Sequence, residues 1–176
     1  MIVEQTTKWI RDVVIGLNFC PFAARELKQG TVHYELCMEE DQKKALAAFL
    51  HECERLDKNP AIETSFLIFP NSFQRFDKYL DLLAMSQELI VQKKYEGIYQ
   101  VASFHPHYCF ADAPQNDAAN YTNRSIYPML HLLREESITH ALKHYKEPEG
   151  IPQRNVDYAR ERGLKYMEML RAACFS

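Results

Sequence analysis

The stretch IYQVASFHPHYCFADAPQNDAANYTNRSIYPMLHLLRE, residues 98–135, holds more chemically reactive side chains than any other part of the chain. It begins with a short apolar run, 98–104, which is typical of a buried β-strand. His105 ends this run and opens a long polar loop. Pro128 suits the first turn of a helix, so we predict a helix from Pro128 to about Glu135. The stretch therefore predicts a strand, a loop rich in functional groups and a helix.

Two further strands and three helices are predicted upstream of this stretch. Residues 31–38 alternate between apolar and polar side chains, and residues 62–69 form a short, mostly apolar run between two prolines. Both patterns are typical of strands. Apolar residues at helical spacing predict helices over 7–19, 41–57 and 72–95. Connections of this length between strands suit right-handed parallel βαβ units, because hairpins need short loops.

These elements predict an α/β fold. We expect a small, mostly parallel sheet of three strands or slightly more, with a βαβαβ core, covering helices, and helical segments at both ends of the chain. An α+β fold with an antiparallel sheet is the alternative, because periodicity does not fix strand direction. We expect residues 1–176 to form a single globular domain. A last helix is predicted from Asn155 toward Cys174, so that residues 153–176 are a candidate C-terminal helical extension.

Composition narrows the class of protein. With 176 residues, of which 47% are hydrophobic and 26% charged, the chain resembles an ordinary globular protein that can bury a core. Its formal charge of −3 and its lack of a long lysine or arginine cluster predict no nucleic-acid partner. No signal-peptide pattern and no apolar stretch of about 18 residues is present, so we expect a cytoplasmic protein without a membrane partner. The five cysteines form no CxxC pair, which predicts reduced thiols.

Cys20 is the first candidate catalytic residue. It lies at the end of the predicted first helix, directly before Pro21. A thiol in such a place can approach backbone N–H groups, and a lowered pKa would make it a nucleophile. The alternative is a buried structural cysteine between Phe19 and Phe22, since free cysteine is among the most buried residue types.

His105 is the second candidate, because it follows a predicted strand. In a parallel sheet this is the carboxyl edge, where open α/β sheets bind ligands. An imidazole there could act as general base or general acid, or it could only hold the loop through a hydrogen bond to a carbonyl group. Glu63, at the head of a predicted strand, is a candidate buried carboxylate that orients His105 or pairs with Arg124, although it could equally face solvent.

A metal site is a weaker hypothesis for the same loop. His105, His107 and Cys109 alternate, and an extended chain would place three such ligands on one face. Asp112 or Asp117, together with His131, would be the alternative ligands. Because no second ligand motif such as HxxxH supports the site, we expect no metal and no cofactor.

Asn123, Arg124 and Ser125 precede the predicted helix and form a candidate substrate-binding group. A helix N-terminus carries partial positive charge, and arginine can bind a carboxylate or phosphate with two hydrogen bonds. The alternative is that Asn123 and Ser125 only cap the helix while Arg124 pairs with Asp112 or Asp117.

His131 and Arg134 lie one turn apart on the predicted helix from Pro128. They share a face that differs from the face of Met129 and Leu132, and this face is a candidate lining of the substrate pocket. An exposed polar face is the alternative.

Three separated segments resemble a known family. They read NFCPFA at 18–23, ET at 63–64 with LIFP at 67–70, and YQ, SFHP, NYTNRS and YPMLHLLRE between 99 and 135. Over about residues 5 to 162 the chain resembles the bacterial family called domain of unknown function 1415. The resemblance implies no established activity, but it places emphasis on the positions that match its motifs: Asn18, Cys20, Pro21, Glu63, His105, Pro106, Tyr121, Asn123, Arg124, Ser125, Pro128, His131 and Arg134. His107 and Cys109 depart from the family pattern.

The functional prediction is an enzyme that acts on a small anionic metabolite, a carboxylate or a phosphate. In this hypothesis His105 moves a proton, Cys20 is a nucleophile or second acid–base group, and Glu63 orients them. The substrate would be bound by Arg124, Asn123, Ser125, His131, Arg134 and Asn18. The alternative function is a non-catalytic module that binds a ligand or a partner. Dimerisation through aromatic residues such as Tyr158 or Tyr166 is open.

Overall fold

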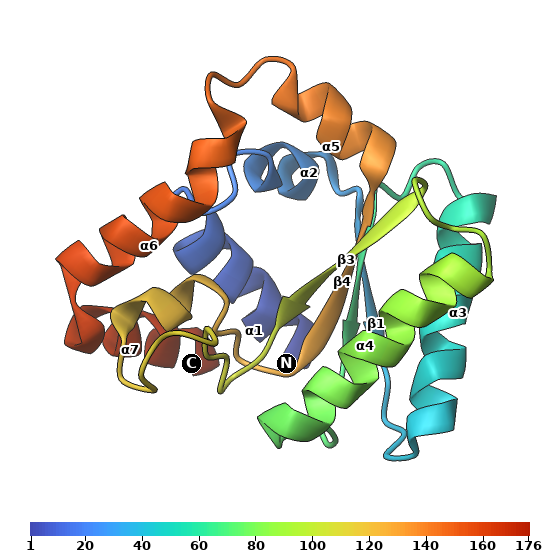
Figure 1. The fold of residues 1–176 in the computed structure, drawn as a ribbon, viewed down its shortest axis with the longest axis horizontal. Coiled ribbons are helices and arrows are strands. Elements are labelled where there is room, and N and C mark those ends of the chain that lie inside the picture. Colours follow the sequence, from blue (N-terminus) through green and yellow to red (C-terminus); the bar gives the residue numbers. More distant parts are fainter.

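A mixed four-stranded sheet lies at the centre of the structure, a computed structural model that describes residues 1–176 (Figure 1). The strands are β1 (Val32–Leu36), β2 (Thr64–Ile68), β3 (Tyr99–Phe104) and β4 (Met129–Arg134), and their order is β1-β2-β4-β3. β1 and β2 are parallel, whereas β4 is antiparallel to both β2 and β3. The α/β class is therefore confirmed, but the sheet is mixed and not mostly parallel.

The helix predicted from Pro128 to Glu135 is wrong, because this segment forms β4, a central strand. Both faces of a central strand are buried, so its apolar residues run almost without interruption and resemble those of a short buried helix. In register, Leu130 lies between Leu67 of β2 and Ser103 of β3. Pro128 stands just before the strand, where its carbonyl oxygen accepts a hydrogen bond of 2.9 Å from the N–H of Phe69.

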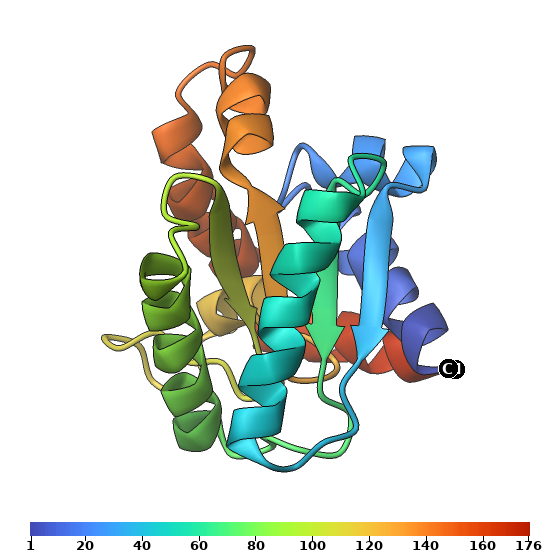
Figure 2. The same cartoon turned by 90° about the vertical axis from the view of Figure 1, so that its right-hand side faces the viewer.

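Two long helices cover one face of the sheet. They are α3 (Gln42–Lys58) and α4 (Phe76–Gln92), close to the ranges predicted from periodicity, and Figure 2 shows them in front of the strands. Asp41 caps α3 by accepting a hydrogen bond from the N–H of Lys44. The core on this side consists of buried residues from both helices and the sheet, among them Phe49, Leu56, Leu67, Tyr79, Leu130 and Leu132.

The opposite face is covered by the two ends of the chain. The first helix begins earlier than predicted, as α1 (Ile2–Trp9), and continues as a π-helical segment, Ile10–Ile15. It is followed by α2 (Ala23–Gln29), and after β4 by α5 (Glu135–Leu142), α6 (Ile151–Arg162) and α7 (Leu164–Ala172). Short 3-10 turns complete the chain at Ala118–Thr122, Pro148–Gly150 and Ala173–Phe175. None of the helices is both long enough and apolar enough to cross a lipid bilayer.

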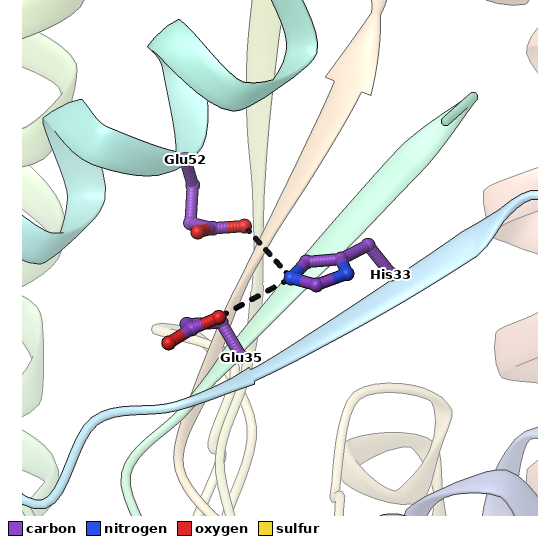
Figure 3. Close-up of side chains that lie close together, drawn as sticks. All are labelled: His33, Glu35 and Glu52. Carbon is purple, nitrogen blue, oxygen red and sulfur yellow. Dashed lines mark hydrogen bonds and ion pairs between the residues drawn. The ribbon is translucent and has the colours of Figure 1, made fainter. Parts of the chain in front are cut away.

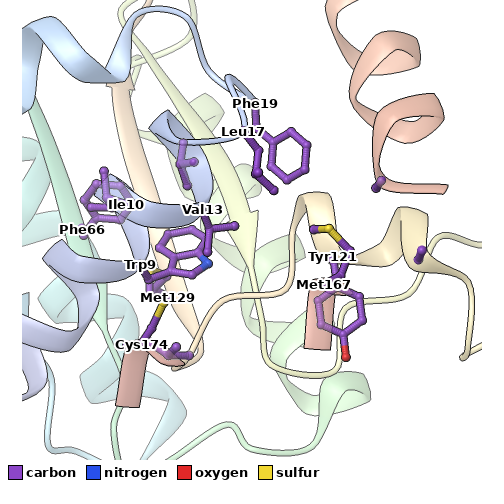
Figure 4. Close-up of a cluster of buried hydrophobic side chains, with 14 of the residues drawn as sticks. Trp9, Ile10, Val13, Leu17, Phe19, Phe66, Tyr121, Met129, Met167 and Cys174 are labelled. Carbon is purple, nitrogen blue, oxygen red and sulfur yellow. The ribbon is translucent and has the colours of Figure 1, made fainter. Parts of the chain in front are cut away.

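The C-terminal helices contribute to the second core. Figure 4 shows this cluster, in which Met167 and Cys174 lie with side chains of the first helix and of the sheet. The single helix predicted toward Cys174 is broken at Gly163, which has a positive φ of 83° and separates α6 from α7. The labelled members of the cluster are Trp9, Ile10, Val13, Leu17, Phe19, Phe66, Tyr121, Met129, Met167 and Cys174.

Candidate functional site

A cavity of about 1300 Å³ lies against the face of the sheet that carries α1, α2 and α5. Its volume exceeds the roughly 300–1,000 Å³ that is typical of small-molecule sites. α2 and α5 cover one end of this face (Figure 1), but neither helix contains a fully buried residue, so they do not fill the space above the strands. The strands contribute Val32, Thr64, Phe66, Ala102, Phe104 and His131 to its lining.

His131 occupies the middle of β4, and its ring lies between β2 and β3. The register pairs it with Phe66 on one side and Ala102 on the other. The imidazole stacks on the Phe66 ring with a centroid distance of 3.9 Å and an interplanar angle of 6°. Burial lowers the pKa of His131 from 6.5 to about 3, so the imidazole is neutral at pH 7.

Thr64 fixes the tautomer of His131. The Thr64 hydroxyl lies 2.7 Å from Nε2 of His131 and 2.5 Å from the carbonyl oxygen of Leu132. A hydroxyl has a single proton, and a carbonyl oxygen can only accept, so Thr64 donates to Leu132 and accepts from Nε2–H of His131. The lone pair therefore resides on Nδ1, which has no hydrogen-bond partner within the protein.

Two buried polar atoms in the lining of the cavity also lack partners. Trp9 is 1% exposed, and its indole N–H has no acceptor. Oε1 of Glu63 is buried without a donor, although the backbone N–H of Glu63 donates to the carbonyl oxygen of Thr31 at 2.8 Å. Both residues line the cavity. Unpaired buried polar atoms are rare in native proteins and occur often where a ligand binds.

Cys20 lies in the wall of the same cavity, ahead of α2. Burial raises the pKa of its thiol above the usual value, while the backbone N–H groups of Phe22 and Ala23 act in the opposite direction. Burial is the larger effect, so the thiol is protonated at neutral pH and is no preformed nucleophile.

The predicted pairing of Cys20 with His105 is wrong, because they lie on opposite faces of the sheet. Cys20 packs against the cluster of Figure 4, whereas the ring of His105 contacts Phe76 and Tyr79 of α4. Both nitrogens of His105 are occupied: Nε2 donates to the carbonyl oxygen of Phe73 at 2.9 Å, and Nδ1 accepts from the N–H of His107 at 2.9 Å. His105 is fully buried, and burial lowers its pKa to about 4. It therefore holds the loop, as in the alternative interpretation.

Arg124 also braces the loop, because two of its three guanidinium nitrogens are bound to the protein. Its Nε donates to the carbonyl oxygen of Tyr108 at 2.9 Å and its Nη2 to that of Gln115 at 2.8 Å. The predicted pairing of Arg124 with Asp117 is absent, since Arg160 binds that carboxylate at 2.8 Å. No helix starts here, because β4 follows.

Asn123 and Ser125 are likewise bound to the backbone. The amide of Asn123 donates to the carbonyl oxygen of Ser103 at 3.2 Å, and the hydroxyl of Ser125 donates to that of Tyr127 at 2.5 Å. These two residues therefore connect the loop to the sheet, and neither lines the cavity.

Arg134 and Asn18 have structural roles as well. Residues three apart in a strand point to opposite faces, so Arg134 and His131 do not share the face predicted for a helix. The guanidinium of Arg134 donates to the carbonyl oxygens of Leu56 at 2.7 Å and Ile62 at 2.9 Å, beside the C-terminus of α3, and only part of its side chain reaches the cavity. Asn18 is exposed in a turn at a positive φ of 55°, and its carbonyl oxygen accepts from Arg154.

A group of titratable side chains on the other face of β1 escaped the sequence analysis. Figure 3 shows His33 of β1 beside the carboxylates of Glu35 and Glu52, with Nε2 of His33 at 3.2 Å and 3.7 Å from their oxygens. These three residues are close enough to hold a metal ion. However, Arg55 already bonds to Glu35 at 3.1 Å and to Glu52 at 2.9 Å. The group is therefore an ion-pair network between β1 and α3.

The metal hypothesis for the loop has no support from this geometry. Nδ1 of His105 is occupied by the His107 N–H, and the thiol of Cys109 donates to the carbonyl oxygens of Phe110 and Ala113.

The cavity residues that were not predicted from the sequence are Thr64 and Trp9. A polar residue at the start of a buried apolar strand was the available signal for Thr64, whereas Trp9 resembled any core residue of an amphipathic helix.

Together, the fold and the cavity define an α/β protein with a large pocket on one face of a mixed sheet. The chain belongs to the family described as "Protein of unknown function (DUF1415)", whose sequence model matches residues 1–169, and this confirms the resemblance seen in the motifs. No curated protein and no solved structure matches the chain.

Proposed function

We propose that the protein is an enzyme that acts on a small organic molecule in the cavity, with His131 as its general base. The observation that carries this proposal is the Thr64–His131 hydrogen bond, because it leaves an unpartnered Nδ1 lone pair on a residue of the cavity lining. A neutral imidazole can accept a proton from a bound substrate. This assignment replaces His105, whose two nitrogens are taken.

Glu63 supports this chemistry. A pKa of about 3 makes His131 a weak proton acceptor unless a negative charge stabilises the imidazolium. Glu63 directly precedes Thr64 and contributes the unpaired carboxylate of the cavity. Cys20 supplies the second group, as an acid in its thiol form or as a nucleophile after it has lost its proton.

The anionic substrate expected from the sequence has less support. It depended on Arg124, whose guanidinium donates to the carbonyl oxygens of Tyr108 and Gln115. The anion and the homodimer therefore stay predictions, and the proposal of an enzyme depends on neither.

The experiment is a turnover screen of the purified protein with model substrates for proton abstraction, ester hydrolysis and acyl transfer. Wild-type protein is compared with His131→Gln and with the matched control His51→Gln, which replaces an exposed histidine outside the cavity. We expect an activity that falls by at least about a hundredfold in His131→Gln, the lower end of general-base contributions, and is unchanged in His51→Gln. Equal activity in all three proteins would rule out His131 as the base.

The second candidate function is a non-catalytic binding module. Burial of Cys20 and His131 favours it, because burial keeps the thiol in its less reactive, protonated form and lowers the pKa of His131, which makes the imidazole a weak proton acceptor. A ligand that binds the cavity tightly, is recovered unchanged, and still binds His131→Gln would support this alternative.

A further inference from the structure

We propose that the cavity binds a small molecule that combines an apolar or aromatic body with a protonated amine, and that Glu63 binds the amine. This inference rests on the proposed function in that it concerns the same cavity, and it assigns the chemical class of the ligand. It departs from the anionic substrate expected from sequence.

The first argument is the missing partner of Glu63. Other carboxylates of the fold have partners: the buried Glu52 binds Arg55 and Ser65, and the exposed Asp57 accepts from Tyr95 and Tyr99. Glu63 forms no ion pair, and its Oε1 is buried without a donor. Because one oxygen of this partly buried carboxylate has no donor, a ligand that brings a positive charge gains more here than a neutral or negative one.

The second argument is the balance of donors and acceptors in the cavity. Among the lining residues, Oε1 of Glu63 and Nδ1 of His131 are acceptors without partners, whereas the Trp9 indole is a buried donor without a partner. An ammonium group has three donors and no acceptor, so it can pair with Oε1 of Glu63 without leaving an acceptor of its own unpaired. A carboxylate or phosphate carries acceptors, would leave Glu63 and His131 unpaired, and would add repulsion with Glu63.

The third argument is that the three cationic side chains of the lining are either exposed or held by backbone carbonyl groups. Arg134 is held by the carbonyl oxygens of Leu56 and Ile62. Arg25 is exposed and lies 3.7 Å from Glu26, and Lys143, which follows α5, is exposed as well. The walls instead contain aromatic rings, Trp9, Phe66 and Phe104, which suit an apolar body and attract a cation to their faces.

The experiment measures binding of three probes with the same body and different charge. They are 1-naphthylmethylamine, 1-naphthalenemethanol and 1-naphthoate, titrated into wild-type protein by calorimetry at pH 7. We expect the amine to bind about tenfold more tightly than the alcohol, and the naphthoate to bind more weakly than either. Naphthoate binding as tightly as the amine, or no amine binding at millimolar concentration, would overturn the proposal.

Variants locate the binding group. Glu63→Gln should lose the preference for the amine over the alcohol, while the matched control Glu136→Gln, at the exposed rim of the cavity, should keep it. Glu63→Asp, which retains the charge, provides a second variant if Glu63→Gln does not fold. An unchanged preference in a folded Glu63→Gln protein would contradict the assignment.

His131→Gln separates this inference from the proposed function. We expect this variant to bind the amine within a few-fold of wild-type protein, because Glu63 is intact. Amine binding that depends on Glu63, without any turnover that depends on His131, would refute the enzyme and keep the ligand class. Turnover that depends on His131, without a preference for the amine, would support the enzyme and refute the ligand class.

Discussion

The hydroxyl of Thr64 lies 2.7 Å from Nε2 of His131 and thereby fixes which nitrogen of the imidazole carries the proton. The relation spans two strands, because Thr64 begins β2 and His131 lies within β4. The central pair of strands thus holds the candidate base in one tautomer before any ligand binds.

The first prediction concerns this hydrogen bond. Thr64→Val should remove the acceptor for Nε2–H and allow both tautomers of His131, whereas Thr64→Ser should preserve the wild-type tautomer. Imidazole ¹⁵N NMR distinguishes the two forms, and the stability cost of Thr64→Val should be about 1 kcal/mol. An identical His131 spectrum in Thr64→Val and wild-type protein would contradict the assigned proton.

The second prediction is acid destabilisation between pH 6.5 and about 4. Burial lowers the pKa of His105 to about 4 and that of His131 to about 3, both from 6.5 in the unfolded chain. Below pH 6.5 the unfolded chain binds more protons, so the free energy of unfolding should fall by up to about 1.4 kcal/mol per pH unit for each histidine. The free energy of unfolding should reach its full value above pH 6.5.

Urea unfolding at a series of pH values checks this prediction. The carboxylates with lowered pKa, Asp77 and Asp117, lose their contribution below their usual value of 3.8, so they do not obscure the histidines. His105→Gln should show a shallower decline than wild-type protein, and His51→Gln should match wild-type protein. A flat profile between pH 6.5 and 4 would count against burial of both imidazoles.

The third prediction concerns Arg124. Arg124→Gln should lower the free energy of unfolding by about 2–3 kcal/mol, because it removes charge-assisted hydrogen bonds to the carbonyl oxygens of Tyr108 and Gln115. Amine binding in the cavity should be unchanged. Chemical denaturation and calorimetry measure the two effects, with exposed Arg11→Gln as control. Loss of ligand binding by a stably folded Arg124→Gln protein would restore the anion site predicted from sequence.

The fourth prediction is that Glu63→Gln stabilises the free protein. Removing this partly buried carboxylate, whose Oε1 has no donor, should raise the free energy of unfolding by at most about 1 kcal/mol in the absence of ligand. Adding an amine should raise the free energy of unfolding of wild-type protein to that of Glu63→Gln, since a ligand stabilises only the folded state that binds it. Thermal unfolding with and without 1-naphthylmethylamine provides both values, and a destabilised Glu63→Gln protein would indicate a structural role.

The fifth prediction concerns the thiol of Cys20. Since burial raises its pKa, alkylation in the native state should be slow at pH 7 and should accelerate only above about pH 9. Mass mapping after iodoacetamide treatment measures this, with partly exposed Cys109 as the internal comparison. Fast alkylation of Cys20 at pH 7 would show a thiolate and would favour the nucleophile proposed from sequence.

Periodicity alone predicted the part of the fold in which one face of each element is buried. α3, α4 and the first three strands carry such patterns, and the structure contains them close to the predicted ranges. β4 was missed because both its faces are buried, and an apolar run such as MLHLL has no period that distinguishes strand from helix. The strand order could not be predicted either, because no local feature of the β4 sequence indicates that this strand lies between β2 and β3.

The error in β4 explains most of the error in the candidate site. A helix at 128–135 implied an anion-binding N-terminus at Arg124 and a shared face for His131 and Arg134, and a strand provides neither. One cavity is nevertheless lined by His131, Glu63 and Cys20. Each of these residues was predicted from its chemistry or its motif and not from the helix. The backbone contacts of His105 and Arg124 depend on the folded loop, so no pattern of residue types could separate bracing side chains from free ones.

The position of β4 also governs how the chain can fold. The strand at the centre of the sheet is the last to be synthesised, and Thr64 is 68 residues away in sequence from the carbonyl group of Leu132 to which it donates. Until residue 134 is available, β2 and β3 each present an unpaired edge to solvent. Non-local pairing of this kind slows folding, and exposed edges promote association between chains. A chain that stops short of β4 is therefore an aggregation-prone intermediate and not a smaller version of the protein.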